Sequence, residues 1–114
     1  MSDLHKAITC LEQAKARLRQ GWCRNQYAAN VFGGYATPSS SDACRWCLVG
    51  SVLRAGDDVS MSAERVSEVI DELCNDLPFN YVSLSLFNDE QDSVEPVVAV
   101  VDKTINRLRR RLCS

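Results

Sequence analysis

Apolar side chains recur every three or four residues near both ends of the chain, which is the spacing of one face of an α-helix. One such stripe lies in residues 3–20 and is followed by Gly21; its members are Leu4, Ala7, Ile8, Leu11, Ala14 and Leu18. A second stripe follows a capping-box pattern at residues 92–95 and consists of Val94, Val98, Val101, Ile105, Leu108 and Leu112. We expect the last helix to pack on the first one in a monomer. The alternative is a homodimer in which the last stripe meets its own copy.

Two further helices are predicted in the middle of the chain. A Pro- and Ser-rich loop at residues 37–42 is followed by a predicted helix from about residue 43 to residue 55. A third helix is predicted to begin after Ser62 and to end before Pro78. Its apolar face is expected to contain Val66, Val69, Ile70, Leu73 and Cys74.

Two short segments favour β-structure. Gly33-Gly34 lies between aromatic and β-branched residues, which predicts a hairpin within residues 26–36. Apolar residues alternate with serines at 82–86, which is the period of a strand. That strand needs a partner, so the segment either joins the hairpin or is irregular. The predicted fold class is therefore mainly α: a compact four-helix domain with a small β-hairpin or short strand.

Size and charge exclude several classes of protein. The chain has 114 residues and a formal net charge of −2, which predicts a single helical domain over residues 1–114. Nucleic acid is not expected as a partner, because its backbone requires a basic face. No apolar run approaches the ~20 residues of a membrane-spanning helix. The segment Met1–His5 lacks the basic and apolar regions of a signal peptide, so we expect a cytoplasmic location.

The chain is rich in cysteine, with six residues of this type. We expect them to be reduced thiols in the cytoplasm, with Cys10 and Cys74 in the core and Cys113 exposed. The other three are the candidate metal ligands: Cys23, Cys44 and Cys47.

Zinc and redox chemistry are the two alternatives for these three thiols. On a helix Cys44 and Cys47 would share a face next to Cys23, and His5, an aspartate or another cysteine would complete a zinc site as the fourth ligand. Zinc sites normally show two ligand pairs, and this chain has one pair and a single cysteine, so we expect packed thiols and no stoichiometric zinc. Elemental analysis checks that expectation. The redox alternative requires Cys44 in the first turn of a helix, where its pKa would be lowered.

The two tryptophans lie in the same two motifs as these cysteines, and we expect the fold to bring the two motifs together. Trp22 and Trp46 are either anchors of an interface or core residues. Arg45 either stacks on a ring and binds an anion, or pairs with a neighbouring carboxylate. The candidate partner-binding residues are Trp22, Tyr35, Arg45 and Trp46.

Catalysis has little support in the sequence. The single histidine, His5, lies far along the chain from every motif, and no glycine-rich phosphate loop is present. We therefore expect a non-enzyme without a cofactor, and we interpret the chain as an interaction or regulatory protein. The alternative is a small thiol-dependent redox enzyme or a Cys-ligated zinc protein.

These motifs together resemble an uncharacterised family of small bacterial and bacteriophage proteins, a group known as a domain of unknown function. The resemblance rests on Gly21-Trp22-Cys23, Tyr27-Ala28 with Gly33-Gly34, Cys44-Arg45-Trp46-Cys47 with Gly50, and Phe87-Asn88-Asp89. The chain differs in having Gly33-Gly34 at a turn that is usually Asp-Gly, and in a longer region at 76–86. The resemblance implies one fold over nearly the whole chain and no particular activity. It favours a phage or prophage origin, and with it an accessory role on a host protein.

Overall fold

The computed structural model describes residues 3–114, and over this range the protein is mainly helical with one small antiparallel sheet. The elements, in chain order, are α1 (Asp3–Gln20), β1 (Ala28–Ala29), β2 (Arg45–Trp46), α2 (Leu48–Asp58), α3 (Ala63–Cys74), α4 (Leu84–Asp89) and α5 (Glu95–Leu112). The predicted fold class is confirmed, with five helices in the described range. None of these helices combines the length and the apolarity needed to cross a membrane.

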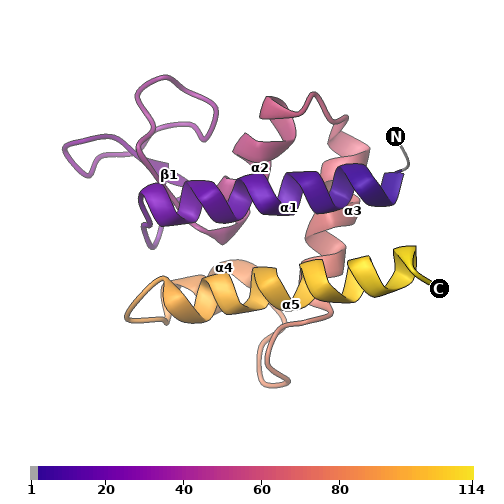
Figure 1. Cartoon of the computed structure of the whole chain (residues 1–114). Coiled ribbons are helices and arrows are strands. Elements are labelled where there is room, and N and C mark those ends of the chain that lie inside the picture. Colours follow the sequence, from indigo (N-terminus) through magenta and orange to yellow (C-terminus); the bar gives the residue numbers. More distant parts are fainter. Residues whose placement is uncertain (1–2) are drawn as a thin grey trace.

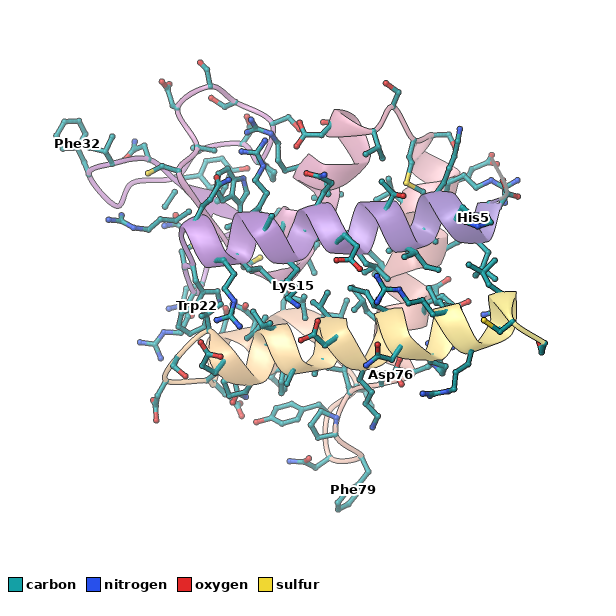
Figure 2. All side chains as sticks on the ribbon, in the orientation of Figure 1. His5, Lys15, Trp22, Phe32, Asp76 and Phe79 are labelled. Atoms are coloured by element: carbon teal, nitrogen blue, oxygen red, sulfur yellow. The ribbon has the colours of Figure 1, made fainter. Side chains whose placement is uncertain are left out.

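The two long helices α1 and α5 pack side by side, as the matching stripes predict, and they run antiparallel (Figure 1). Their apolar faces meet in the core, where the largest buried residues of α1 and α5 include Leu11, Leu18, Val101 and Leu108. Lys15 points from α1 towards α5 (Figure 2), and its Nζ lies 2.7 Å from a carboxylate oxygen of Asp102. Such exposed ion pairs add little stability, so the apolar faces hold the two helices together.

Helices α2 and α3 lie behind α1 in the same view and cover its other side (Figure 1). Ser62 caps α3 by accepting a hydrogen bond from the backbone N–H of Arg65, as predicted. Cys10 is buried in the core and Cys113 is exposed, also as predicted. The core position predicted for Cys74 is wrong. The buried face of α3 runs through Leu73, and the next residue is turned about 100° away from it, towards solvent.

The predicted helix at 43–55 begins later, at Leu48. The residues before it form β2, which pairs with β1 in the register Ala28 to Trp46 and Ala29 to Arg45. The predicted hairpin at 26–36 is reduced to one isolated bridge, Ala29 to Tyr35. β1 instead pairs mainly with β2, because the 37–42 loop returns the chain to a position beside β1.

Residues 82–86 form neither of the two expected structures, a strand or an irregular segment, because this segment leads into helix α4. Ser83 caps this helix by accepting a hydrogen bond from the N–H of Leu86. A strand would place Leu84 and Leu86 on one face, whereas the helix buries Leu84 with Phe87 and leaves Leu86 half exposed. The capping box predicted before α5 also fails: Val94 is the N-cap residue and makes no side-chain hydrogen bond.

A partly buried polar network joins the segment after α3 to α5. Asp76 lies against α5 (Figure 2) and is 7% exposed; Thr104 Oγ1 donates to its Oδ2 over 2.6 Å, and Arg107 Nη2 does so over 2.9 Å. Arg107 also donates to Glu72 over 2.9 Å. Burial by itself would raise the pKa of Asp76, but the hydrogen bonds from Arg107 and Thr104 outweigh burial and hold that pKa below its ordinary value.

We expect Arg107→Met to destabilise the fold by about 3 kcal/mol at neutral pH, because it leaves the Asp76 carboxylate buried without its cation. A lowered pKa in the folded state gives stability above the unfolded pKa, and this stability is lost as the pH falls through the folded pKa. The difference in the free energy of unfolding between wild type and Arg107→Met should therefore become smaller below about pH 4, near the ordinary carboxyl pKa. Urea unfolding at pH 7, 5 and 3.5 measures this difference. A difference that stays constant with pH would contradict the role of Arg107 as the partner of the Asp76 carboxylate.

Candidate functional site

The fold brings the two tryptophan-containing motifs together, as expected from the sequence. Trp22 and Trp46 form an isolated parallel bridge just after α1. The N–H of Trp46 donates to the carbonyl of Gly21 over 3.0 Å, and the N–H of Cys23 donates to the carbonyl of Trp46 over 3.2 Å. We call this pair of parallel segments, residues 21–23 and 45–47, the tryptophan bridge.

Asn88 of α4 holds the tryptophan bridge in place, and its side chain is completely buried. Its Oδ1 accepts from Trp22 Nε1 over 2.8 Å and from the first backbone N–H of α2, that of Leu48, over 3.0 Å. Its Nδ2 donates to the carbonyl of Cys23 over 3.1 Å. One amide therefore connects the end of α1, the start of α2 and α4. Asn88 had no predicted role, although it belongs to the motif Phe87-Asn88-Asp89.

A glycine lets α2 approach the segment before β1. A Cβ added to Gly50 would lie 1.8 Å from the carbonyl oxygen of Tyr27, so no other residue fits without moving backbone. The same carbonyl accepts from the N–H of Cys47 over 3.1 Å. The Cys-x-x-Cys motif and the glycine that follows it thus form a tight structural junction.

The two tryptophans have different surroundings. Trp46 is 2% exposed, its Nε1 donates to the carbonyl of Pro38 over 2.9 Å, and the guanidinium groups of Arg17 and Arg54 lie 5.3 and 5.6 Å from its ring centroid. Of the two alternatives for Trp46, the structure shows the core residue, because its ring is enclosed. Trp22 is half buried, with the Arg24 guanidinium 5.9 Å from its ring centroid.

The three candidate ligand cysteines do not share a helix face. Cys44 is exposed and precedes β2, whereas Cys47 is buried and is the N-cap of α2. The sulfur of Cys47 accepts from the N–H of Gly50 over 3.3 Å, and that of Cys23 lies 3.6 Å from the carbonyl of Gln26. Across residues 3–114, no group of three or more His, Cys, Asp and Glu side chains is arranged to hold a metal ion.

The thiols next to the tryptophan bridge are held in the protonated form. Burial, and then the nearby Cys47, raises the pKa of Cys23 to about 12. Burial also raises the pKa of Cys47, although hydrogen bonds from backbone N–H groups at the start of α2 oppose that rise. The cysteine at a helix N-terminus is therefore Cys47. The redox alternative required Cys44 in that position. His5 lies at the opposite end of α1 from Trp22 (Figure 2).

A second feature of this region is a turn that presents aromatic side chains to solvent. We call residues 27–35 the aromatic turn. Its side chains with large exposed fractions are Phe32 at 93%, Val31 at 66%, Tyr35 at 60% and Tyr27 at 46%. Phe32 projects away from the body of the molecule (Figure 2). It was absent from the candidate partner-binding set, although the apolar residues before Gly33-Gly34 were visible in the sequence.

Asn30 holds the aromatic turn in one conformation. Its Oδ1 accepts from the N–H of Phe32 over 2.9 Å and from the N–H of Gly34 over 3.0 Å. Its own N–H donates to the carbonyl of Gly34 over 2.9 Å. Gly33 has φ of 84°, a left-handed conformation that favours glycine. Of the candidate partner-binding residues, Tyr35 belongs to this turn and Arg45 contacts it, with Nη1 3.4 Å from the Asn30 carbonyl.

Comparison with protein families gives one match. The model of a family of unknown function, DUF6197, matches residues 3–107. The chain belongs to this family. No curated protein and no solved structure matches the chain significantly.

Membership of DUF6197 agrees with the resemblance inferred from the sequence and carries no activity with it. The surface of this DUF6197 protein is therefore the basis for a proposed function. That surface has one more exposed aromatic loop, at residues 78–82, where Phe79 is completely exposed and Val82 is 92% exposed (Figure 2).

Proposed function

We propose that this protein is a non-catalytic interaction protein, a phage or prophage accessory factor that binds and modulates a host protein through the aromatic turn. The observation that carries the proposal is the exposure of Phe32 on a turn that Asn30 holds in one conformation. Tyr35 of the same turn is exposed, and Arg45 contacts the turn at the Asn30 carbonyl, so both extend this surface. Trp22, half buried at the tryptophan bridge, is a further candidate contact.

A rigid exposed aromatic residue is well suited to binding. A phenylalanine side chain buries about 150–250 Å² of surface when it enters a pocket, which makes aromatic residues frequent anchors of interfaces. A turn that is already ordered loses little conformational entropy on binding, so more of that burial contributes to affinity. Asn30 provides this order through hydrogen bonds to two backbone N–H groups of the turn. The nearby Arg45 adds a cation for a carboxylate on the partner.

The surroundings of the thiols support a binding role rather than thiol chemistry. Nucleophilic or redox cysteines act as thiolates, which requires a lowered pKa. The pKa values of Cys23 and Cys47 are both raised, and burial is the first cause in each case. These two thiols are better suited to packing at the tryptophan bridge than to chemistry on a substrate.

The proposal is tested by placing a photo-crosslinking amino acid at position 32 in a bacterial lysate and then purifying the captured protein. We expect Phe32→Ser to weaken binding of that purified protein at least tenfold, about 1.4 kcal/mol, because the anchor is lost. Phe79→Ser is the matched control, since Phe79 is equally exposed but lies on another loop. Both variants should have the same free energy of unfolding as the wild type. Unchanged affinity of Phe32→Ser, or loss of binding only in Phe79→Ser, overturns the proposal.

A further inference from the structure

A groove of about 470 Å³ lies between α2, α3 and the 37–39 loop, away from the residues of the aromatic turn. Its apolar lining includes Leu53 of α2, Met61 of the α2–α3 connection and Ile70 of α3. All three side chains are half buried and pack against the core from outside. The groove is therefore a partly open apolar surface, with a size that falls in the range of about 300–1,000 Å³ typical of small-molecule sites.

One carboxylate, that of Asp57, lines this otherwise uncharged groove. Asp57 lies in the last turn of α2, and the hydroxyl of Ser39 donates a hydrogen bond to its carboxylate. That bond ties the 37–39 loop to the helix and forms one wall of the groove. None of the ion pairs found within residues 3–114 includes Asp57.

The basic side chains closest in sequence to Asp57 pair with a different carboxylate, that of Asp58. Arg17 and Arg54 both pair with Asp58, at 2.9 and 3.3 Å. Arg54 also donates to the carbonyls of Pro38 and Ser40, over 3.2 and 3.4 Å. The last turn of α2 contains no basic residue, and the C-terminal end of a helix carries partial negative charge. Asp57 and the helix end therefore place negative charge on this side of the groove, while the charge of the adjacent Arg54 is balanced by Asp58.

We propose that the groove binds a small apolar cation, an organic molecule with a hydrocarbon or aromatic body and a single ammonium group. The body covers Leu53, Met61 and Ile70, and the ammonium group lies against the Asp57 carboxylate. The chemical reason is complementarity: an apolar lining takes up the body, and an unneutralised carboxylate at its edge selects for positive charge. This site is separate from the aromatic turn and does not depend on the function proposed for it.

The test compares three probes of equal chain length: octylamine, octan-1-ol and octanoate. Methyl NMR of the full chain reports on the groove, because Met61 is one of only two methionines and Ile70 lies nearby. We expect all shifts to centre on these two methyl groups, with octylamine binding tightest and octanoate weakest. A charge-assisted contact at a partly exposed site predicts a preference of about fivefold for the amine over the alcohol.

Two substitutions separate the charged part of the site from its apolar part. Asp57→Asn should remove the preference for octylamine and leave the affinity for octan-1-ol unchanged. Ile70→Thr should weaken all three probes by a similar factor. The matched control is Asp71→Asn, which removes an exposed carboxylate of α3 that does not line the groove and should change nothing. Equal affinity of the wild type for amine and alcohol, an Asp57→Asn variant that keeps the preference, or shifts centred outside the groove overturns the proposal.

Discussion

Asn88→Leu is expected to destabilise the protein by about 3–5 kcal/mol, although leucine has nearly the same size and asparagine makes no ion pair. The side chain of Asn88 is completely buried and satisfies three groups that belong to separate parts of the chain. These groups are Trp22 Nε1, the N–H of Leu48 and the carbonyl of Cys23. Leucine would leave all three without this partner, and each buried group that loses its hydrogen bond costs about 1–3 kcal/mol.

Urea unfolding followed by circular dichroism measures this loss. Trp22→Phe is the companion variant, because it removes only the indole N–H and should cost about 1 kcal/mol. Asn75→Leu is the control at an exposed asparagine after α3 and should cost little. If Asn88→Leu is no less stable than Trp22→Phe, then Asn88 does not connect the three segments as described.

Ile105→Asp is expected to unfold the domain. Ile105 is 2% exposed and lies on the apolar face of α5 that packs on α1. An unpaired carboxylate in that position costs several kcal/mol, which is comparable with the entire stability of a small domain, about 5–15 kcal/mol. The neighbouring change Asn106→Asp adds the same charge at an exposed position of the same helix and should leave the fold intact.

Light scattering and circular dichroism on both variants distinguish packing within one chain from packing between two chains. We expect a monomeric wild type, a folded monomeric Asn106→Asp variant and an unfolded Ile105→Asp variant. The opposite result would be a dimeric wild type that Ile105→Asp converts into a folded monomer. That outcome would mean that the apolar face of α5 meets its own copy rather than α1.

The surface side chains of the site were partly visible in the sequence. Tyr35 and Arg45 were candidate partner-binding residues, and they lie together at the aromatic turn. Phe32 was missed, because exposure of a large apolar side chain cannot be recognised in a short glycine-flanked segment without knowing what packs against it. Trp46 was a candidate because a large aromatic ring can serve as an interface anchor. Its burial became visible only in the structure, where Arg17 and Arg54 lie over the ring.

Three elements of the fold followed from the sequence alone, because their periodicity is long enough to outweigh local ambiguity. The stripes of α1 and α5 predicted both helices and their packing, and Ser62 predicted the start of α3. The shorter segments were decided by tertiary contacts. Residues 45–46 became a strand because β1 lies beside them, and α4 formed where a helix buries Leu84, Phe87 and Asn88 together.

The sequence by itself determined a helical domain with α5 on α1, because a long apolar stripe has a large free energy of burial and needs a matching surface. It also placed the cysteines and tryptophans in two motifs that meet. Only the tertiary structure decided what those motifs do. Their backbones pair as a parallel bridge, the buried amide of Asn88 joins them, and the thiols of Cys23 and Cys47 lie where burial raises their pKa. Hydrogen-bond partners and desolvation depend on residues distant in the chain, and no local pattern encodes them.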